Sequence, residues 1–246
     1  GGQRICAVCL SQHSNMENNM KFRIKHEPRS LSDLVFADQS MQEIIADYVH
    51  GIREHHLILH GPAGSGKTQA AHIILQAQLG DMYGTKMADV FNGQGLSVND
   101  IRTMDDMYNW QVTQCGKAVF LVDEVDFADT TAKRALRELI ENKAYATLIC
   151  TTNHLHKLDI AFQNRFDKRE VLLPTLQQWL PRAQQIMRAE GFQLTHAQLS
   201  QALVGFNGSA RDLLNELENF LLTLKRQSSM QKFQPQVMLQ KQSSSR

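Results

Sequence analysis

The 246-residue sequence has almost no net charge, no long hydrophobic run and few cysteines. Its 26 basic and 25 acidic side chains nearly cancel, so the chain as a whole is not a polycation, and any contact with nucleic acid requires a local patch. No apolar run approaches the roughly 20 residues that a membrane-spanning helix needs. The first residues also lack a hydrophobic segment of signal-peptide length, so we expect neither secretion nor a membrane partner.

Four cysteines, two of them in predicted core elements, favour a reduced, intracellular protein over one held together by disulfides. Cys6 and Cys9, followed by His13, have part of a zinc-ligand spacing. A structural zinc site needs four ligands, and the sequence has no second cysteine pair to complete it. Two unpaired thiols in a flexible arm are therefore the favoured interpretation, and zinc binding is the alternative.

Strand-like and helix-like segments alternate through most of the chain, which predicts an α/β fold with a parallel five-stranded sheet. The predicted strands are His56–His60, Ala88–Asn92, Ala118–Val122, Ala146–Thr151 and Glu170–Leu173. The predicted helices between and before them are Met41–Gly51, which Ser40 could cap, Thr68–Leu79, Val98–Gln111 and Thr131–Glu141.

Only helical patterns follow Pro174, over Leu176–Glu190, Thr195–Val204 and Ser209–Lys225. The last stretch, Lys225–Arg246, has five basic and no acidic residues and is rich in Gln and Ser, which is typical of a disordered tail. We therefore expect a flexible N-terminal arm over 1–21, an α/β core over 22–173, a small helical domain over 174–225 and a disordered, basic and polar tail over 226–246.

The first strand leads into a segment that matches G-x-x-x-x-G-K-[ST] in full: Gly61-Pro62-Ala63-Gly64-Ser65-Gly66-Lys67-Thr68. Glycines let backbone N–H groups curl around phosphate oxygens, and the helix that begins here points the positive end of its dipole at them. Lys67 should reach the β- and γ-phosphates, and the Thr68 hydroxyl should bind Mg²⁺. The strand before and the helix after this loop are the context that a nucleotide site requires.

Two adjacent acids, Asp123 and Glu124, end the apolar strand Val119–Val122. An acid at the carboxyl end of a buried parallel strand lies next to the phosphate-binding loop, where Asp123 can hold the Mg²⁺ shell. Glu124 is then positioned to activate the attacking water as a general base. Together, the loop and the acids predict an Mg²⁺-dependent ATPase.

The spacing of these and further motifs resembles AAA+ ATPases, and among them the clamp-loader small subunits of the replication factor C and bacterial gamma/tau type. The segments that carry the resemblance are Lys25–Val35, Ala135–Glu141, Thr151-Thr152-Asn153, Asn164-Arg165-Phe166 and Gly208-Ser209-Ala210-Arg211. It implies an AAA+ core with the helical domain as a lid. Unlike clamp-loader subunits, this sequence shows no C-terminal collar domain, which we therefore do not expect.

The resemblance also implies roles for four residues. Asn153 corresponds to sensor 1 and would orient the lytic water. Arg165 would be an arginine finger that reaches the ATP of a neighbouring subunit. Arg211 corresponds to sensor 2 on the lid and would contact the γ-phosphate, and Val35 would lie against the adenine. A finger supplied in trans leaves the site of a monomer incomplete, so we expect an assembly with identical or related AAA+ subunits.

Two functions fit these features. One is an oligomeric assembly factor that acts on DNA, clamp-loader-like or accessory to replication or recombination, with a replication or recombination protein as partner. The other is an ATP-controlled switch or filament-forming scaffold that recruits a protein partner, of the helicase-loader, initiator-regulator or transposition-regulator type. A protein-threading ring is disfavoured, because Gly93–Ser97 lacks the aromatic residue of a pore loop. We expect the protein in the cytoplasm, or with the nucleoid or nucleus if it acts on DNA.

Overall fold

The computed structural model describes residues 21–86 and 89–242. The group of Cys6, Cys9 and His13 lies outside these residues, as does nearly all of the predicted arm. The chain divides into two compact units. The larger unit consists of Pro28–Gln178 and Asn207–Ala210. The smaller unit consists of the described residues before Pro28, Trp179–Phe206 and the described residues from Arg211 onward.

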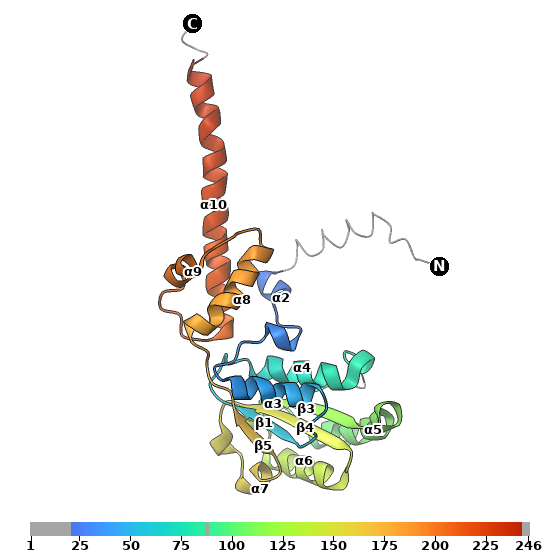
Figure 1. Ribbon diagram of the computed structural model, residues 1–246. Coiled ribbons are helices and arrows are strands. Elements are labelled where there is room, and N and C mark those ends of the chain that lie inside the picture. The colour runs from blue at the N-terminus through green and yellow to red at the C-terminus, as the bar shows by residue number, and fades with distance from the viewer. Residues whose placement is uncertain (1–20, 87–88, 243–246) are drawn as a thin grey trace, which may run out of the picture. The chain divides into compact units, whose positions relative to one another are not determined.

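The larger unit contains a five-stranded sheet in the order β2-β3-β4-β1-β5, and all neighbouring strands are parallel (Figure 1). Its strands are β1 (Leu57–His60), β2 (Val90–Asn92), β3 (Ala118–Asp123), β4 (Ala146–Thr152) and β5 (Asp167–Glu170). The predicted parallel five-stranded sheet is therefore confirmed.

Alternate residues of the central strands enter two different apolar layers. On one face, Leu57 and Leu59 pack with α3 (Gln39–Val49) and α4 (Lys67–Leu79). On the other face, Ile58 and Phe120 pack with α5 (Val98–Cys115) and α6 (Thr130–Asn142), and Figure 1 shows α3 and α6 on opposite sides of the sheet. A sheet covered on both faces explains why its inner strands are apolar throughout.

Short elements complete this unit. They are the α-helix α7 (Ile160–Gln163) and the 3-10 turns η1 (Leu31–Asp33), η2 (Gly80–Met82), η3 (Val125–Phe127) and η4 (Leu155–Lys157). Both η3 and η4 directly follow a central strand, β3 and β4 respectively. These two turns therefore carry residues at the carboxyl edge of the sheet.

Three sequence predictions need correction. Asp38 caps α3 by accepting from the Ser40 N–H group, so Ser40 is not the cap. The last strand is Asp167–Glu170 and not Glu170–Leu173, because this edge strand pairs with β1 through a polar Asp-Lys-Arg-Glu segment that has no apolar pattern. Of the two cysteines expected in core elements, Cys150 is buried, but Cys115 is exposed at the end of α5.

The smaller unit is helical. It contains α2 (Phe22–Lys25), most of α8 (Leu176–Ala189), α9 (His196–Ala202) and α10 (Ala210–Gln242) except its first residue. Side chains from α2, α8, α9 and α10 form its interior: Phe22, Trp179, Leu180, Ala183, Ile186, Met187, Leu199, Leu213, Leu217 and Leu221. Lys25 and His26 both bind the Glu190 carboxylate, at 2.8 and 2.9 Å, which fixes α2 to this unit.

Helix α10 continues to Gln242, whereas the sequence predicted a disordered tail over 226–246. The physical reason lies in the composition of this segment. Six Gln, two Met and two Lys have unbranched side chains that lose little rotamer freedom in a helix, whereas its five Ser and Pro235 are poor helix formers. Among the described residues, every helix is too short or too polar to span a bilayer.

Candidate active site

The candidate site lies where the carboxyl ends of β1, β3 and β4 meet. In the strand register, His60 pairs with Thr152, and Val122 pairs with Cys150. The residues that follow these pairs are the phosphate-binding loop after β1, Asp123 and Glu124 at the end of β3, and Asn153 after β4. Parallel strands thus bring together three segments that are far apart in the sequence.

The phosphate-binding loop, Gly61–Thr68, turns tightly enough that two of its glycines have no room for a side chain. A Cβ atom on Gly61 would lie 2.4 Å from the Val171 carbonyl oxygen, and one on Gly64 would lie 2.3 Å from Ser209 Oγ. Within this loop, Gly66 caps α4 in the left-handed conformation. The N-terminus of this 13-residue helix therefore opens into the loop, as a site for phosphate requires.

Lys67 is held inside the loop, with only 6% of its surface exposed. Its ammonium group donates to the carbonyl oxygens of Gly61, at 2.9 Å, and Pro62, at 2.7 Å. Burial lowers the pKa of Lys67, and the nearby carboxylates of Asp123, Glu124 and Asp126 oppose this shift. The Lys67 ammonium group thus lies between the loop and the acids at the end of β3, where it could bind the phosphates of a nucleotide.

Asp123 and Thr68 are in direct contact, as their proposed roles require. Asp123 Oδ1 accepts from Thr68 Oγ1 at 2.9 Å and also from the hydroxyl of Thr151. A hydroxyl and a carboxylate side by side are the hard oxygen donors that Mg²⁺ prefers. These two residues therefore fit the metal that the sequence predicts.

Glu124 has an unusual backbone conformation. Its φ of 53° is the only positive value among the non-glycine residues that the structure describes. Its N–H group donates to Thr151 Oγ1 at 3.0 Å, and a Cβ on Gly93 would lie only 2.1 Å from its carbonyl oxygen. The peptide is thus fixed by a hydrogen bond on one side and by close backbone packing on the other, which is typical of strain held at a functional site.

Asn153 is half-buried directly after β4, between Thr152, which binds the turn after β3, and His154, which binds Thr152. Thr152 Oγ1 donates to Asp126 Oδ1 at 2.7 Å and accepts from the His154 N–H group at 2.9 Å. Sequence reasoning did not include Asp126 among the site residues. The signal was present in Asp-Glu-Val-Asp, where a third acid follows Asp123 and Glu124.

The structure places Arg165 with α6 and α7. Its guanidinium group forms an ion pair with Glu141, with Nε and Oε1 2.5 Å apart, and donates to the Ala161 carbonyl. The residue is exposed, with 35% of its side chain accessible. Its contacts thus lie with α6 and α7, whereas Thr68 contacts Asp123 and Lys67 contacts the phosphate-binding loop.

The residues just before Arg211 reach the phosphate-binding loop. The Ala210 N–H group donates to the Gly64 carbonyl oxygen at 2.9 Å, and Ser209 lies where a side chain on Gly64 would be. Arg211 itself is exposed in the first turn of α10. Val35 is half-buried between Leu34 and Phe36, both of which pack against the apolar layer of α3 and α4, whereas Val35 is not part of that layer.

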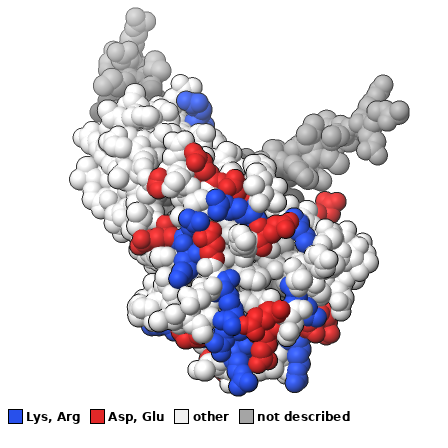
Figure 2. All heavy atoms as spheres, turned by 60° about the horizontal axis from the view of Figure 1, so that its bottom comes forward, with Lys and Arg blue, Asp and Glu red and all other residues white. Residues whose placement is uncertain are grey.

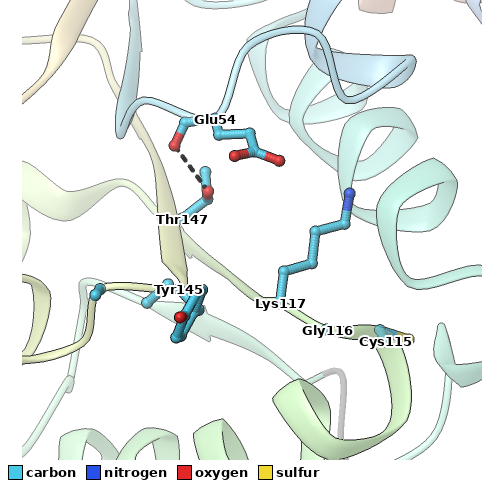
Figure 3. Close-up of a pocket in the computed structure, with 8 residues that line it drawn as sticks. Glu54, Cys115, Gly116, Lys117, Tyr145 and Thr147 are labelled. Carbon is cyan, nitrogen blue, oxygen red and sulfur yellow. Dashed lines mark hydrogen bonds between the residues drawn. The ribbon is translucent and has the colours of Figure 1, made fainter.

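A separate pocket of about 330 Å³ lies at the opposite end of β3 and β4 (Figure 3). Its lining includes Glu54, Lys117, Tyr145 and Thr147, and the Thr147 hydroxyl donates to the Glu54 carbonyl oxygen at 3.0 Å. The pocket is at the amino ends of the strands and contains none of the predicted site residues.

Residues 57–173 match the AAA family, described as the ATPase family associated with various cellular activities. The sequence is 26% identical over 201 residues to replication factor C subunit 4 of Encephalitozoon cuniculi, which covers 79% of this chain and 62% of that protein. It is 26% identical over 227 residues to replication factor C subunit 3 of Saccharomyces cerevisiae, which covers 88% of this chain and 64% of that protein. The chain thus spans less than two thirds of these relatives.

The fold is similar to that of a variant of RuvB from Thermotoga maritima, with a TM-score of 0.64 and 17% sequence identity. The match covers 81% of this chain and 67% of that one. At this identity the likeness concerns the fold, which is the one that the P-loop and the parallel sheet predicted. Residues 57–173 thus match the AAA ATPase family, and the chain has the α/β fold of P-loop AAA+ ATPases.

Proposed function

We propose that this ATPase depends on Mg²⁺ and acts as an oligomeric assembly factor on DNA. The observation that carries the proposal is the contact of Thr68 with Asp123 beside the buried Lys67, together with an exposed Arg165 that lies with other elements. The first group is suited to bind and hydrolyse ATP. The second is suited to complete the site of another subunit.

Lys67 would bind phosphate by exchanging its bonds to the Gly61 and Pro62 carbonyl oxygens for bonds to phosphate oxygens. The other loop residues, Ala63, Ser65 and Gly66 among them, would offer their N–H groups. Thr68 and Asp123 would hold Mg²⁺, which when bound would offset the negative charge of the phosphates. Val35 would contact the adenine base.

Glu124 would accept a proton from the attacking water, and Asn153 would orient that water. The left-handed backbone of Glu124 supports this role, because the Thr151 hydroxyl and the close packing of Gly93 leave its peptide little freedom. A general base that is already oriented loses little conformational entropy on reaching the transition state, which lowers the barrier. General-base catalysis of this kind contributes on the order of 10²- to 10⁴-fold to the rate.

Arg165 would act in trans. In the isolated chain it pairs with Glu141, and an exposed ion pair of this kind is worth at most about 1 kcal/mol. A neighbouring γ-phosphate, which carries more charge than one carboxylate, would therefore compete well for the guanidinium group. Arg211 would contact the γ-phosphate bound by its own chain, and the bond from Ala210 to Gly64 would couple that contact to the loop.

The DNA part of the proposal is supported by the replication factor C relatives and needs a local binding surface. On the face that Figure 2 shows, Lys and Arg side chains lie among Asp and Glu side chains, and no large area carries one charge. DNA would therefore be bound by contacts repeated across subunits, either copies of this chain or related AAA+ proteins. A replication or recombination protein is the partner that this role implies.

The test is ATP turnover against protein concentration, with and without primed and duplex DNA, for the wild type and Arg165→Ala. We expect turnover per subunit to rise with concentration, to rise again with DNA, and to fall at least tenfold in Arg165→Ala. Arg134→Ala is the matched control, because Arg134 is also exposed and paired with an acid of α6, Glu138. If ATP turnover per subunit is independent of protein concentration and is unchanged in Arg165→Ala, the proposal is contradicted.

One observation favours the second function, a nucleotide switch or scaffold that recruits a protein. In a single chain Arg165 pairs with Glu141 and has no neighbouring ATP to contact, which suits slow turnover until a partner is present. This alternative predicts ATP-dependent assembly in the absence of DNA, with no stimulation of turnover by DNA. Sedimentation with a slowly hydrolysed ATP analogue, run beside the DNA titration, distinguishes the two.

A further inference from the structure

Two adjacent threonines at the end of β4 bind two different acids of the segment after β3. Thr151 joins Asp123 and the Glu124 N–H group, whereas Thr152 joins Asp126. Both threonines are only 1% exposed. The bonds of Thr151 involve Asp123 and Glu124, which already have proposed roles in the site. The bond of Thr152 involves Asp126, which has no role so far.

Asp126 is a buried acid whose carboxylate is only partly satisfied. Only 7% of its surface is exposed, and its Oδ1 accepts from Thr152 Oγ1 at 2.7 Å. Its Oδ2 is buried and has no hydrogen-bond partner among the described residues. Lys133 contacts the backbone carbonyl of Asp126, at 3.0 Å, and not the carboxylate. A buried, half-satisfied carboxylate costs stability, so its presence in η3 calls for another explanation.

The bonds of Thr152 fix the two sides of Asn153. A hydroxyl has a single proton, and Thr152 donates it to Asp126 while its oxygen accepts from the His154 N–H group. Asn153 is the residue between Thr152 and His154. The Asp126 carboxylate thus fixes Thr152 at the start of the turn Thr152–His154, and the Thr152 hydroxyl binds the last residue of that turn.

We infer that Asp126 is a positioning residue for ATP hydrolysis, which holds Asn153 in place through Thr152. The inference rests on the proposed role of Asn153 in orienting the attacking water. Without the Thr152 hydroxyl, the His154 N–H group loses its acceptor and the turn is free to rotate. Small misplacements of a catalytic group lower rates strongly, so a loss of about tenfold is expected.

A merely structural role for the Asp126–Thr152 bond makes a different prediction. If the bond only stabilised the end of the sheet, its loss would lower the melting temperature and leave turnover per folded molecule unchanged. A positioning role lowers kcat while nucleotide affinity stays constant, because Lys67 and Thr68 lie on separate segments. The separation of kcat from affinity therefore decides between the two.

The test compares Thr152→Val and Asp126→Ala with Thr152→Ser, which restores the hydroxyl. Thr147→Val is the matched control, because it removes a 3.0 Å hydroxyl bond to Glu54 at the other end of the same strand. We expect the first two variants to lower kcat about tenfold with nucleotide Kd within about twofold, and the other two to resemble the wild type. If Thr152→Val unfolds at the assay temperature, Asp126→Asn keeps the side-chain shape and is expected to lower kcat about threefold.

Asn153→Ala, alone and combined with Thr152→Val, completes the test. We expect the double variant to be no slower than Asn153→Ala, because both changes act through one residue. Losses that multiply in the double variant overturn the role of Asp126, and so does a wild-type kcat in Thr152→Val. A wild-type kcat in Asn153→Ala has a different meaning, since it overturns the proposed role of Asn153 itself.

Discussion

The two ends of the same strands, β3 and β4, differ in how they treat polar groups. At the carboxyl ends, Asp126, Thr151 and Thr152 are at most 7% exposed; Thr152 binds Asp126, and Thr151 binds Asp123. The adjacent loop holds Lys67, which is 6% exposed and binds the Pro62 carbonyl oxygen. At the amino ends, Tyr145 is 64% exposed and lines an open pocket (Figure 3). Both ends carry acids, hydroxyls and a lysine, so composition does not separate them.

Burial and backbone constraint separate the two ends. The carboxyl end contains the left-handed Glu124, the tight Gly61 and Gly64, and the close packing of Gly93. The left-handed backbone of Glu124 costs stability, and the tight contacts of the three glycines leave the surrounding backbone few alternative arrangements. The difference implies that substitutions at the carboxyl end alter turnover, whereas chemically similar ones at the amino end leave it intact.

The largest effect is expected from Glu124→Gln, which removes the base and keeps the shape. We expect kcat to fall on the order of 10²- to 10³-fold. Nucleotide Kd should stay within about twofold, because Lys67 and the loop are unchanged. Steady-state turnover and equilibrium binding of a fluorescent nucleotide measure the two quantities.

The matched change at the amino end is Glu54→Gln, in the pocket of Figure 3. It should leave kcat within about twofold. A comparable loss in both variants would contradict the contrast between the two ends. It would point instead to a general sensitivity of the sheet to charge.

The next effect concerns Gly93→Ala, where a methyl group would lie 2.1 Å from the Glu124 carbonyl oxygen. The Glu124 peptide must move, so we expect kcat to fall at least tenfold and the free energy of unfolding to fall by about 1–3 kcal/mol. Gly95→Ala is the control. Gly95 has a φ of +91° but nothing within 4 Å of a Cβ, so it tests backbone strain alone.

The Gly95→Ala variant should lose about 1–2 kcal/mol of stability and keep its kcat. Chemical denaturation and turnover, measured on both variants, separate the two effects. If Gly93→Ala keeps its kcat while losing stability like Gly95→Ala, then the position of Glu124 does not depend on its contact with Gly93.

Much of the carboxyl end was predictable from sequence, for a definite reason. The phosphate-binding loop and the acids after β3 follow strands that are apolar along their whole length, and parallel pairing then places their ends together. The parallel sheet was predictable for the same reason, and the structure confirms it. The polar strand β5 was misplaced by three residues, because Asp-Lys-Arg-Glu forms a strand only through pairing with β1.

The supporting contacts could not be predicted in the same way. The bond of Thr152 to Asp126 joins residues 26 apart, and the contact of Gly93 with Glu124 depends on how a loop packs. Neither leaves a periodic pattern in the sequence. The pairing of Arg165 with Glu141 is similar, since it follows from the packing of α6 against the loop after α7.

The smallest effect is expected at the amino end, from the pH dependence of His56. Its Nδ1 accepts from the Leu148 N–H group at 3.1 Å, so the ring must be unprotonated at this nitrogen. Burial lowers the pKa of His56 below its ordinary 6.5, and the nearby His55 adds to this shift. The unfolded chain therefore binds this proton more readily than the folded chain once the pH falls below 6.5.

Stability from this group is thus complete above pH 6.5 and is lost as the pH falls from 6.5 through the lowered pKa of the folded state, with a slope of at most about 1.4 kcal/mol per pH unit. In His56→Gln, whose amide oxygen can still accept from Leu148, the free energy of unfolding should fall less steeply between pH 7 and 5 than in the wild type. Other buried histidines contribute equally to both proteins, so the difference between the two curves isolates His56. Denaturation at a series of pH values measures it, and parallel curves would show that His56 is already neutral or equally protonated in both states. At pH 7.5 kcat should be the same in both proteins, because His56 lies at the end of the sheet opposite Glu124.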